Sequence, residues 1–201
     1  MDLMHPIHDT IAGSSSGYPI LLLNLFKMDT NKSLSSSLHA EIESILNEQI
    51  KYEAHASALY LAMSAWCEEK GYEGSANFFA KQSDEERTHM LKLFKYVNAR
   101  GGSAKSPEVT RIPDQFNSFR SLFEQTLKQE MFVTQQFNQI AEKCMELKDY
   151  VTFHFIQWFL AEQVEEEFVA RRILELFDLI GEEGTGRWEI DQQVPKVTFE
   201  S

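Results

Sequence analysis

Four predicted helices each carry an acid or an amide at the centre of a stripe of apolar side chains, where a metal ion could bind. Alternate steps of three and four residues along a helix trace the side that a helical bundle buries. These stripes are apolar at both ends, and the residues at their centres are Glu53, Glu86, Glu130 and Gln163. Glu166 follows Gln163 in the last stripe. Carboxylates that project into a bundle can act as ligands for divalent cations.

The spacing of these residues places them at one height in the bundle. Glu53 and Glu86 are 33 residues apart, and Glu130 and Gln163 are also 33 residues apart. If each pair spans a helical hairpin, its two members lie at similar distances from the turn. His89 follows Glu86 by three residues, so its ring points to the same layer.

Such a layer needs positive charge to be stable. A buried carboxylate without a partner costs several kcal/mol, and like charges nearby increase that cost. No lysine or arginine occupies the four stripes, and Arg87 lies about 100° round its helix from Glu86. Bound divalent cations would supply the charge, and carboxylates with one imidazole suit iron, manganese or zinc and not copper(I). The alternative is a metal-free helical scaffold in which each acid is a partly hydrated core residue.

The helices that must hold this layer are delimited by residues that break helices. The predicted helices are 38–67, 74–100, 118–147, 149–180 and a short fifth one near 187–193. The hydroxyls of residues 35–37 and of Ser118 offer N-terminal caps, and Gly101 is a suitable stop for the second helix. The chain is therefore expected to be all-α.

The lengths of the connections predict the topology. The breaks near residues 71 and 148 are short, so helices one and two form a hairpin, as do helices three and four. The connection at 101–117 contains Pro107 and Pro113, and its roughly 17 residues could extend over about 55 Å. A helix of about 28 residues is roughly 42 Å long, so this connection can run the length of the bundle. We expect a four-helix bundle with one long crossover between helices two and three.

Composition and charge restrict the possible partners. The 201 residues carry a net charge of −12, which argues against nucleic acid and anionic membranes and favours attraction of cations. Cys67 and Cys144 form no metal-binding pattern, and they indicate buried free thiols in a reducing, cytoplasmic compartment. No stretch of the sequence is apolar over the length that a membrane-spanning helix needs.

Three regions are expected along the chain. Residues 1–33 lack a helical period, and Met28 could equally serve as a start, so this segment is interpreted as a disordered or mis-started leader. Residues 34–195 form the predicted helical domain that holds the acidic layer, and 196–201 form a C-terminal tail.

Four segments resemble, in order, the helix signatures of bacterial non-haem ferritins, a family within the ferritin-like di-iron superfamily. The segments are "NEQIKYE", "DEERTHM", "KQEMFVTQQ" and "QWFLAEQVEEE". The resemblance implies a ferritin-like bundle whose subunits form a hollow homo-oligomeric shell, with 24 subunits in this family. It implies that the shell takes up iron(II), oxidises it with dioxygen or peroxide, and stores and detoxifies iron as an iron(III) mineral.

The resemblance also implies roles for individual residues. Glu53, Glu86 and His89 would form the first iron site, and Glu86 would bridge to a second site completed by Glu130, with Gln163 beside it. Tyr60 resembles the tyrosine that supplies an electron in this family. The residues that match the family's third iron site are Glu85, Glu162, Glu165 and Glu166.

Several of these residues have plainer interpretations. Glu85 and Glu162 lie at the edge of their stripes and could belong to a solvated helix face. Tyr60 could be a core residue with a bonded hydroxyl, and packing is the better interpretation of Trp158. The remaining histidines of the predicted bundle are expected to be ordinary surface or core residues; these are His39, His55 and His154.

Differences between this sequence and related families restrict the predicted family and the predicted cofactor. Many di-iron bundles have Glu-x-x-His on two helices, whereas here the fourth helix has Gln163-x-x-Glu166. Arg87 occupies the position of the haem-binding methionine of bacterioferritins, so haem is not expected. A di-iron oxygenase would need a substrate pocket, and the bulky residues above and below the acids offer no obvious one.

Overall fold

The computed structural model describes residues 36–199, which fold into helices joined by turns and one long connection. The elements are α1 (Ala40–Lys70), α2 (Glu73–Ala99), α3 (Phe119–Glu146), α4 (Tyr150–Ile180), α5 (Gly186–Gln193) and a short 3-10 helix, η1 (Val194–Lys196). The all-α prediction is confirmed, and every predicted helix end lies within three residues of the observed one. The predicted leader, residues 1–33, lies outside the described residues.

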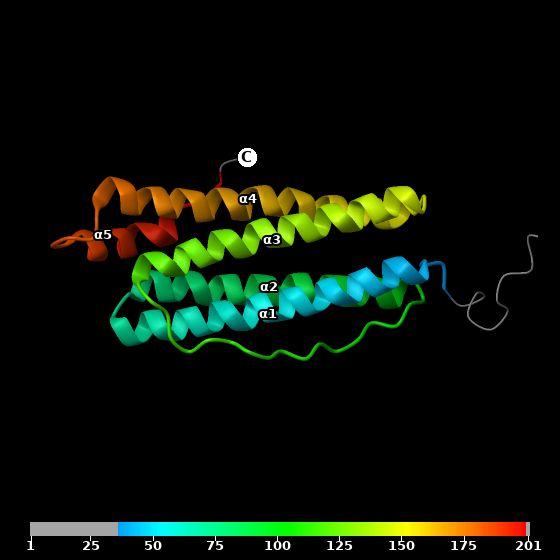
Figure 1. Ribbon diagram of the computed structural model, residues 1–201, viewed down its shortest axis with the longest axis horizontal. Coiled ribbons are helices and arrows are strands. Elements are labelled where there is room, and N and C mark those ends of the chain that lie inside the picture. The colour runs from blue at the N-terminus through cyan, green and yellow to red at the C-terminus, as the bar shows by residue number, and fades with distance from the viewer. Residues whose placement is uncertain (1–35, 200–201) are drawn as a thin grey trace, which may run out of the picture. The chain divides into compact units, whose positions relative to one another are not determined.

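The four long helices form two hairpins joined by a crossover, as predicted. α1 pairs with α2 and α3 pairs with α4, while the connection between α2 and α3 runs beside α1 along the bundle (Figure 1). Two contacts fix this path: Asn47 of α1 accepts a hydrogen bond from the backbone of Lys105 at 2.8 Å, and Phe116 packs edge-on against Trp66. α2 and α3 therefore run in the same direction.

The helix caps agree with the sequence in part. Ser118 caps α3, and it forms a capping box with Ser121. Gly101 follows α2 with φ of 78°, a left-handed conformation that glycine adopts without strain. The expectation that Ser36 or Ser37 would cap α1 is wrong. The helix begins at Ala40, so its N-cap is His39, whose ring nitrogen accepts a hydrogen bond from the backbone of Glu41 at 3.4 Å.

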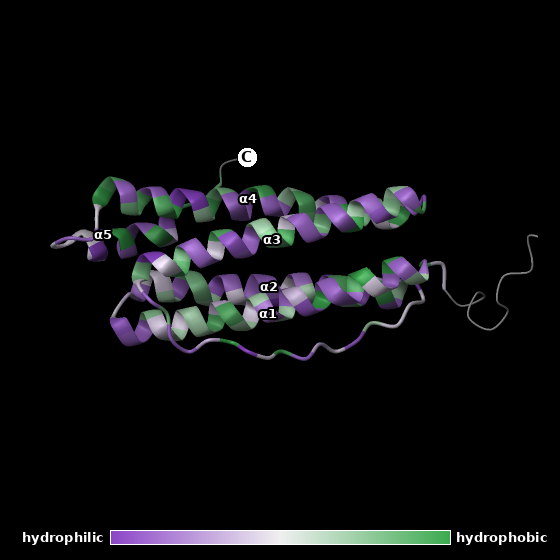
Figure 2. Ribbon diagram, in the orientation of Figure 1, coloured by the Kyte–Doolittle hydropathy of each residue, from purple (hydrophilic) through white to green (hydrophobic). Residues whose placement is uncertain are grey.

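Two apolar clusters fill the bundle, one on each side of the acidic residues. In α1, Ile42 and Leu46 belong to one cluster and precede Glu53, whereas Leu59 and Met63 belong to the other and follow it. Figure 2 shows apolar and polar residues alternating along every helix, as expected of amphipathic helices around a core. None of the helices within residues 36–199 is long and apolar enough to cross a membrane.

The short C-terminal helices close one end of the bundle. Asp191 of α5 accepts hydrogen bonds from the backbone of Gly74 at 3.0 Å and of Ser75 at 2.8 Å, at the start of α2. A carboxylate is well placed there, because the first N–H groups of a helix lack helical partners and carry partial positive charge. Packing continues past the predicted domain end at Pro195, since Val197 packs against the core and Phe199 contacts Phe168 edge-on.

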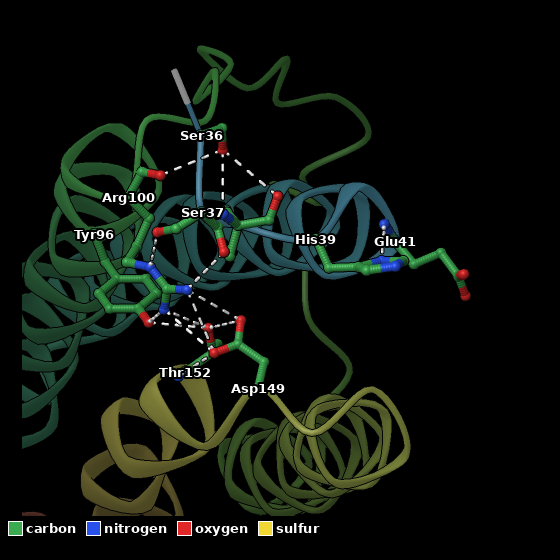
Figure 3. A network of polar contacts seen from close by, with 9 residues as sticks. Ser36, Ser37, His39, Glu41, Tyr96, Arg100, Asp149 and Thr152 are labelled. Atoms are coloured by element: carbon green, nitrogen blue, oxygen red, sulfur yellow. Dashed lines mark hydrogen bonds and ion pairs between the residues drawn. The ribbon is translucent and has the colours of Figure 1, made fainter. Parts of the chain in front are cut away.

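Arg100 joins three segments at the opposite end (Figure 3). Its guanidinium donates to the carbonyl of Ser37 at 2.9 Å, to the hydroxyl of Tyr96 at 2.7 Å and to that of Thr152 at 3.1 Å. It also pairs with Asp149, the N-cap of α4, at 3.3 Å. Both charged side chains are largely buried, at 14% and 10% exposure. The end of α2, the start of α4 and the segment before α1 are thus held by one side chain.

Replacing Arg100 with Met should lower the free energy of unfolding by about 2 kcal/mol, because Asp149 would keep its buried charge and lose its partner. The corresponding loss in melting temperature is roughly 4–8 °C, measured by circular dichroism. Arg120→Met is the matched control. Arg120 pairs with Asp178, whose side chain is 67% exposed, so this change should cost about 0–1 kcal/mol. Equal losses in the two variants would contradict the role assigned to Arg100.

Candidate metal centre

Two hairpin-paired helices bring three candidate ligands together. Glu53 comes from α1, and Glu86 and His89 come from α2, one turn apart. Each residue offers one ligand atom, and these atoms all lie within 4.8 Å of one another. The three side chains are buried, at 0%, 4% and 5% exposure. The imidazole Nδ1 of His89 lies 3.5 Å from a carboxylate oxygen of Glu86.

The other hairpin contributes the remaining residues of the predicted layer. Glu130 of α3 and Gln163 of α4 are also buried. Glu130 lies close enough to Glu53 for their charges to interact, and the side chain of Gln163 lies beside it. Glu86 in turn interacts electrostatically with Glu130. The structure thus brings together the five residues that the register of the sequence placed at one height.

Tyr60 lies directly beside this layer. Its ring is fully buried and stacks on Phe79, and its hydroxyl donates a short hydrogen bond to Glu130. The ring packs as a core residue, and the hydroxyl at the same time contacts a candidate ligand.

Three carboxylates in the layer each retain an oxygen without a partner. These buried atoms are Oε2 of Glu53, Oε2 of Glu86 and Oε2 of Glu130. Within residues 36–199 none of the three acids forms an ion pair with a lysine or arginine. Buried polar atoms are almost always paired, so three unpaired oxygens around an imidazole fit the donor set of a hard divalent cation.

Burial and mutual repulsion change how these acids titrate. Burial raises the pKa of Glu53 and of Glu86, and nearby carboxylates raise each further. Burial, with the charge of Glu166, raises the pKa of Glu130 to about 8. Burial, with the charges of Glu85 and Glu162, raises the pKa of Glu166 to about 8. Without a cation, the layer favours protonated acids.

A second acidic group lies between α2 and α4 at the edge of the layer. Its members line a hollow of about 460 Å³, and they are Glu85, Glu162, Glu165 and Glu166. This group is more exposed to water than the layer, because Glu165 is exposed. Glu85 accepts a hydrogen bond from Gln82 at 2.6 Å and forms an ion pair with Lys81 at 3.3 Å. Residues 195 and 197–199 also line the hollow, and no periodic pattern in the sequence could have predicted that.

Two polar residues that touch the layer were not singled out from the sequence. Gln49 lies one turn before Glu53, and its amide donates to Glu53 Oε1 at 2.8 Å. Thr134 lies one turn after Glu130, and its hydroxyl lies 3.1 Å from Gln163 Oε1. Their spacing of four residues from a predicted ligand was the available signal.

Trp158 and the remaining histidines of the bundle lie outside the group of candidate ligands. Trp158 packs edge-on against His89 with ring centroids 5.4 Å apart, so it is a packing residue in contact with a candidate ligand. His39 is the helix cap already described, and His55 and His154 lie outside the cluster of candidate ligands.

The expectation of no obvious substrate pocket concerned the residues above and below the acids, and a separate hollow lies on the bundle surface. A hollow of about 520 Å³ lies between α1 and α3, and Ile45 and Ile140 are among the residues that line it. Gln49 and Tyr52 line it, whereas the carboxylates of the layer are not among its described lining residues.

Comparisons with known proteins agree with this arrangement. Residues 43–180 match the family model described as "Ferritin-like domain". The chain is 38% identical over 162 residues to a bacterial non-heme ferritin of Campylobacter jejuni, covering 81% of this chain and 97% of the relative. It is 38% identical over 157 residues to that of Escherichia coli O6:H1, covering 78% and 95%. Among solved structures, an open pore ferritin of Archaeoglobus fulgidus is similar with a TM-score of 0.77 and 34% identity, covering 81% and 100%.

We expect the metal-free protein to lose stability as the pH rises from about 5 to about 8. The folded state keeps a proton on Glu130 up to about pH 8, whereas the unfolded chain releases it near the ordinary value of 4.5. The stability that protonated Glu130 contributes is therefore fully present below pH 4.5 and is lost as the pH rises to about 8. Glu130→Gln, which cannot ionise, should flatten the dependence and raise the melting temperature at pH 8.

The measurement is thermal melting in the presence of a chelator at both pH values. Glu124→Gln is the control, because Glu124 lies on the same helix with its side chain 45% exposed. It should retain the pH dependence of the wild type. A Glu130→Gln protein with an unchanged pH dependence would contradict the burial of charge described here.

Proposed function

Because this chain belongs to the ferritin family, among the bacterial non-haem ferritins, we propose that it stores and detoxifies iron and is itself a ferroxidase. In this proposal iron(II) binds in the acidic layer, is oxidised there by dioxygen or peroxide, and is kept as an iron(III) mineral. Iron is the substrate and cargo of the protein, and haem has no part in the reaction.

The observation that supports this function most is the cluster of Glu53, Glu86 and His89 with its unpaired carboxylate oxygens. We assign the first iron to these three residues. Glu86 bridges to a second iron, which Glu130 completes with Gln163 beside it. The metal-free scaffold is the competing interpretation, and it leaves the three unpaired oxygens without an explanation.

The layer suits the oxidation of two iron(II) ions together. Each iron gives up one electron, so a pair held about 3.5–4 Å apart can reduce one dioxygen by two electrons to the level of peroxide. The carboxylates are hard anionic ligands and stabilise the iron(III) product. Reducing the peroxide on to water takes two more electrons; Tyr60, which donates a hydrogen bond to Glu130, is placed to supply one of them, and a third iron(II) would supply the other. The apolar clusters on both sides exclude water from the reacting ions.

We also propose that copies of this chain assemble into a hollow shell of 24 subunits in the cytoplasm. Large apolar side chains are exposed at both ends of α4 and on α5, and their burial between subunits would favour assembly. Those most exposed are Leu179 at 73%, Trp188 at 64%, Val151 at 62% and Tyr150 at 61%. The net charge of −12 favours the approach of iron(II) and disfavours nucleic acid and anionic membranes.

A third iron site is proposed in the hollow between α2 and α4, with Glu85, Glu162, Glu165 and Glu166 as ligands. Glu166 supports this assignment because it belongs both to the hollow and to the charges that act on Glu130. The hollow therefore lies next to the proposed iron pair. Its partly exposed acids are suited to an ion that binds transiently.

Replacing Glu86 with Ala should nearly abolish fast iron oxidation, since one side chain that contacts both ions would be lost. Loss of a residue that only hydrogen-bonds to a metal ligand lowers metal affinity or activity by about 10–100-fold. We therefore expect the rate of iron oxidation to fall by roughly 100-fold or more when a ligand itself is lost. Stopped-flow absorbance after iron(II) is added in air measures the rate. Metal-free Glu86→Ala should be as stable as the wild type or more so, because a repulsive buried charge is removed.

Glu124→Ala is the matched control and should oxidise iron at the wild-type rate. If Glu86→Ala also oxidises iron at that rate, the assignment of the site is wrong.

Replacing Glu162 with Ala should leave the first fast oxidation nearly normal, because the ligands of the iron pair remain. It should change the later steps, namely the oxygen consumed per iron and the rate at which a second addition of iron is oxidised. An oxygen electrode and successive iron additions at two salt concentrations measure both quantities. A solvated surface acid would give only a small, salt-screened change, and that outcome would remove the third site from the proposal.

A further inference from the structure

One hydroxyl links the acidic layer to the surface of α4. Thr134 Oγ1 lies 3.1 Å from Gln163 Oε1 and 2.7 Å from Glu167 Oε1. Glu167 pairs with Arg171 one turn further along the same helix. The order from surface to interior is therefore Arg171, Glu167, Thr134, Gln163 and then the carboxylate of Glu130.

The hydroxyl has only one proton to donate, and two oxygens face it. A carboxylate is the stronger acceptor, and its hydrogen bonds are shorter, so the proton of Thr134 belongs to Glu167. The lone pairs of Thr134 then face Gln163 and need a donor there. The amide of Gln163 provides one if it turns by 180°, which places its NH2 group against Thr134.

That turn changes what Gln163 offers to the layer. In the orientation of the structure, the amide oxygen faces Thr134, so the amide nitrogen is on the side of Glu130 and would repel a cation. In the turned orientation the carbonyl oxygen faces Glu130 and is available as a neutral oxygen ligand. The second orientation suits an occupied layer, where the oxygens of Glu130 bind cations and no longer need the amide donor.

We propose that Thr134, anchored by Glu167, is a positioning residue that holds the amide of Gln163 with its oxygen toward the bound cation. This inference rests on the proposed function, because it assumes that the layer binds cations. It assigns Gln163 a direct contact through oxygen and assigns Thr134 no contact with the cation. Glu167 acts only through Thr134.

The test compares Thr134→Val, which keeps the shape and removes the hydroxyl, with Thr134→Ser, which keeps the hydroxyl. Metal-free protein is titrated with Co²⁺, which air does not oxidise under these conditions and whose visible spectrum reports the ligands. We expect Thr134→Val to weaken the second Co²⁺ site by about tenfold, as for other outer partners of metal ligands, and to alter its spectrum. Thr134→Ser should bind as the wild type does.

A double-variant comparison separates positioning from simple cross-linking of α3 and α4. In a Gln163→Leu background the amide is absent, so Thr134→Val should cause no further loss of Co²⁺ affinity. Equal losses in both backgrounds would show that Thr134 acts only through packing, and they would overturn the proposal. Wild-type affinity and spectrum in Thr134→Val would overturn it as well.

The same titration distinguishes a wrong role for Thr134 from a wrong assignment of the metal centre. If the wild type binds a pair of Co²⁺ ions and Thr134→Val binds the pair with the same affinity and spectrum, the metal centre stands and the role of Thr134 is wrong. If the wild type binds no Co²⁺, the metal centre itself is wrong and the role of Thr134 falls with it.

Discussion

Repulsion among buried carboxylates is the constraint on which the rest of this bundle depends. Glu53, Glu86 and Glu130 lie in one dehydrated layer, and each has an oxygen without a partner. Without cations the layer opposes folding, so stability must come from elsewhere in the bundle. It comes from the apolar cluster on each side of the layer and from the polar contacts that close the two ends.

Proton and cation compete for the same oxygens. A carboxyl group with a pKa near 8, as Glu130 and Glu166 have, is half protonated at a pH where an ordinary glutamate is fully charged. Binding a divalent cation must therefore release protons, and the affinity of the layer rises with pH over the range in which the empty bundle weakens. The hydrogen bonds from Gln49 and Tyr60 hold the first oxygens of Glu53 and Glu130 in place and leave the second oxygens available.

The features that could be predicted from the sequence are those that follow a regular spacing of residues along the chain. The helices, their stripes and the equal spacing of Glu53–Glu86 and Glu130–Gln163 determine the layer, since a hairpin fixes which heights coincide. The cap at His39 and the amide orientation at Gln163 could not be predicted, because they depend on the rotamers of single side chains. The path of residues 197–199 beside Glu166 depends on the turn after α4, which has no repeating pattern to read.

The division of the interior into two apolar clusters also affects how such a chain can evolve. Ile42 and Leu46 share no cluster with Leu59 and Met63, because the acidic layer lies between the two groups. Substitutions that share no partner act on stability nearly independently. Each half of the bundle can therefore accumulate compensating changes separately, and its outer surface can change with it. Lineages can diverge in how their subunits meet while they inherit the same central layer.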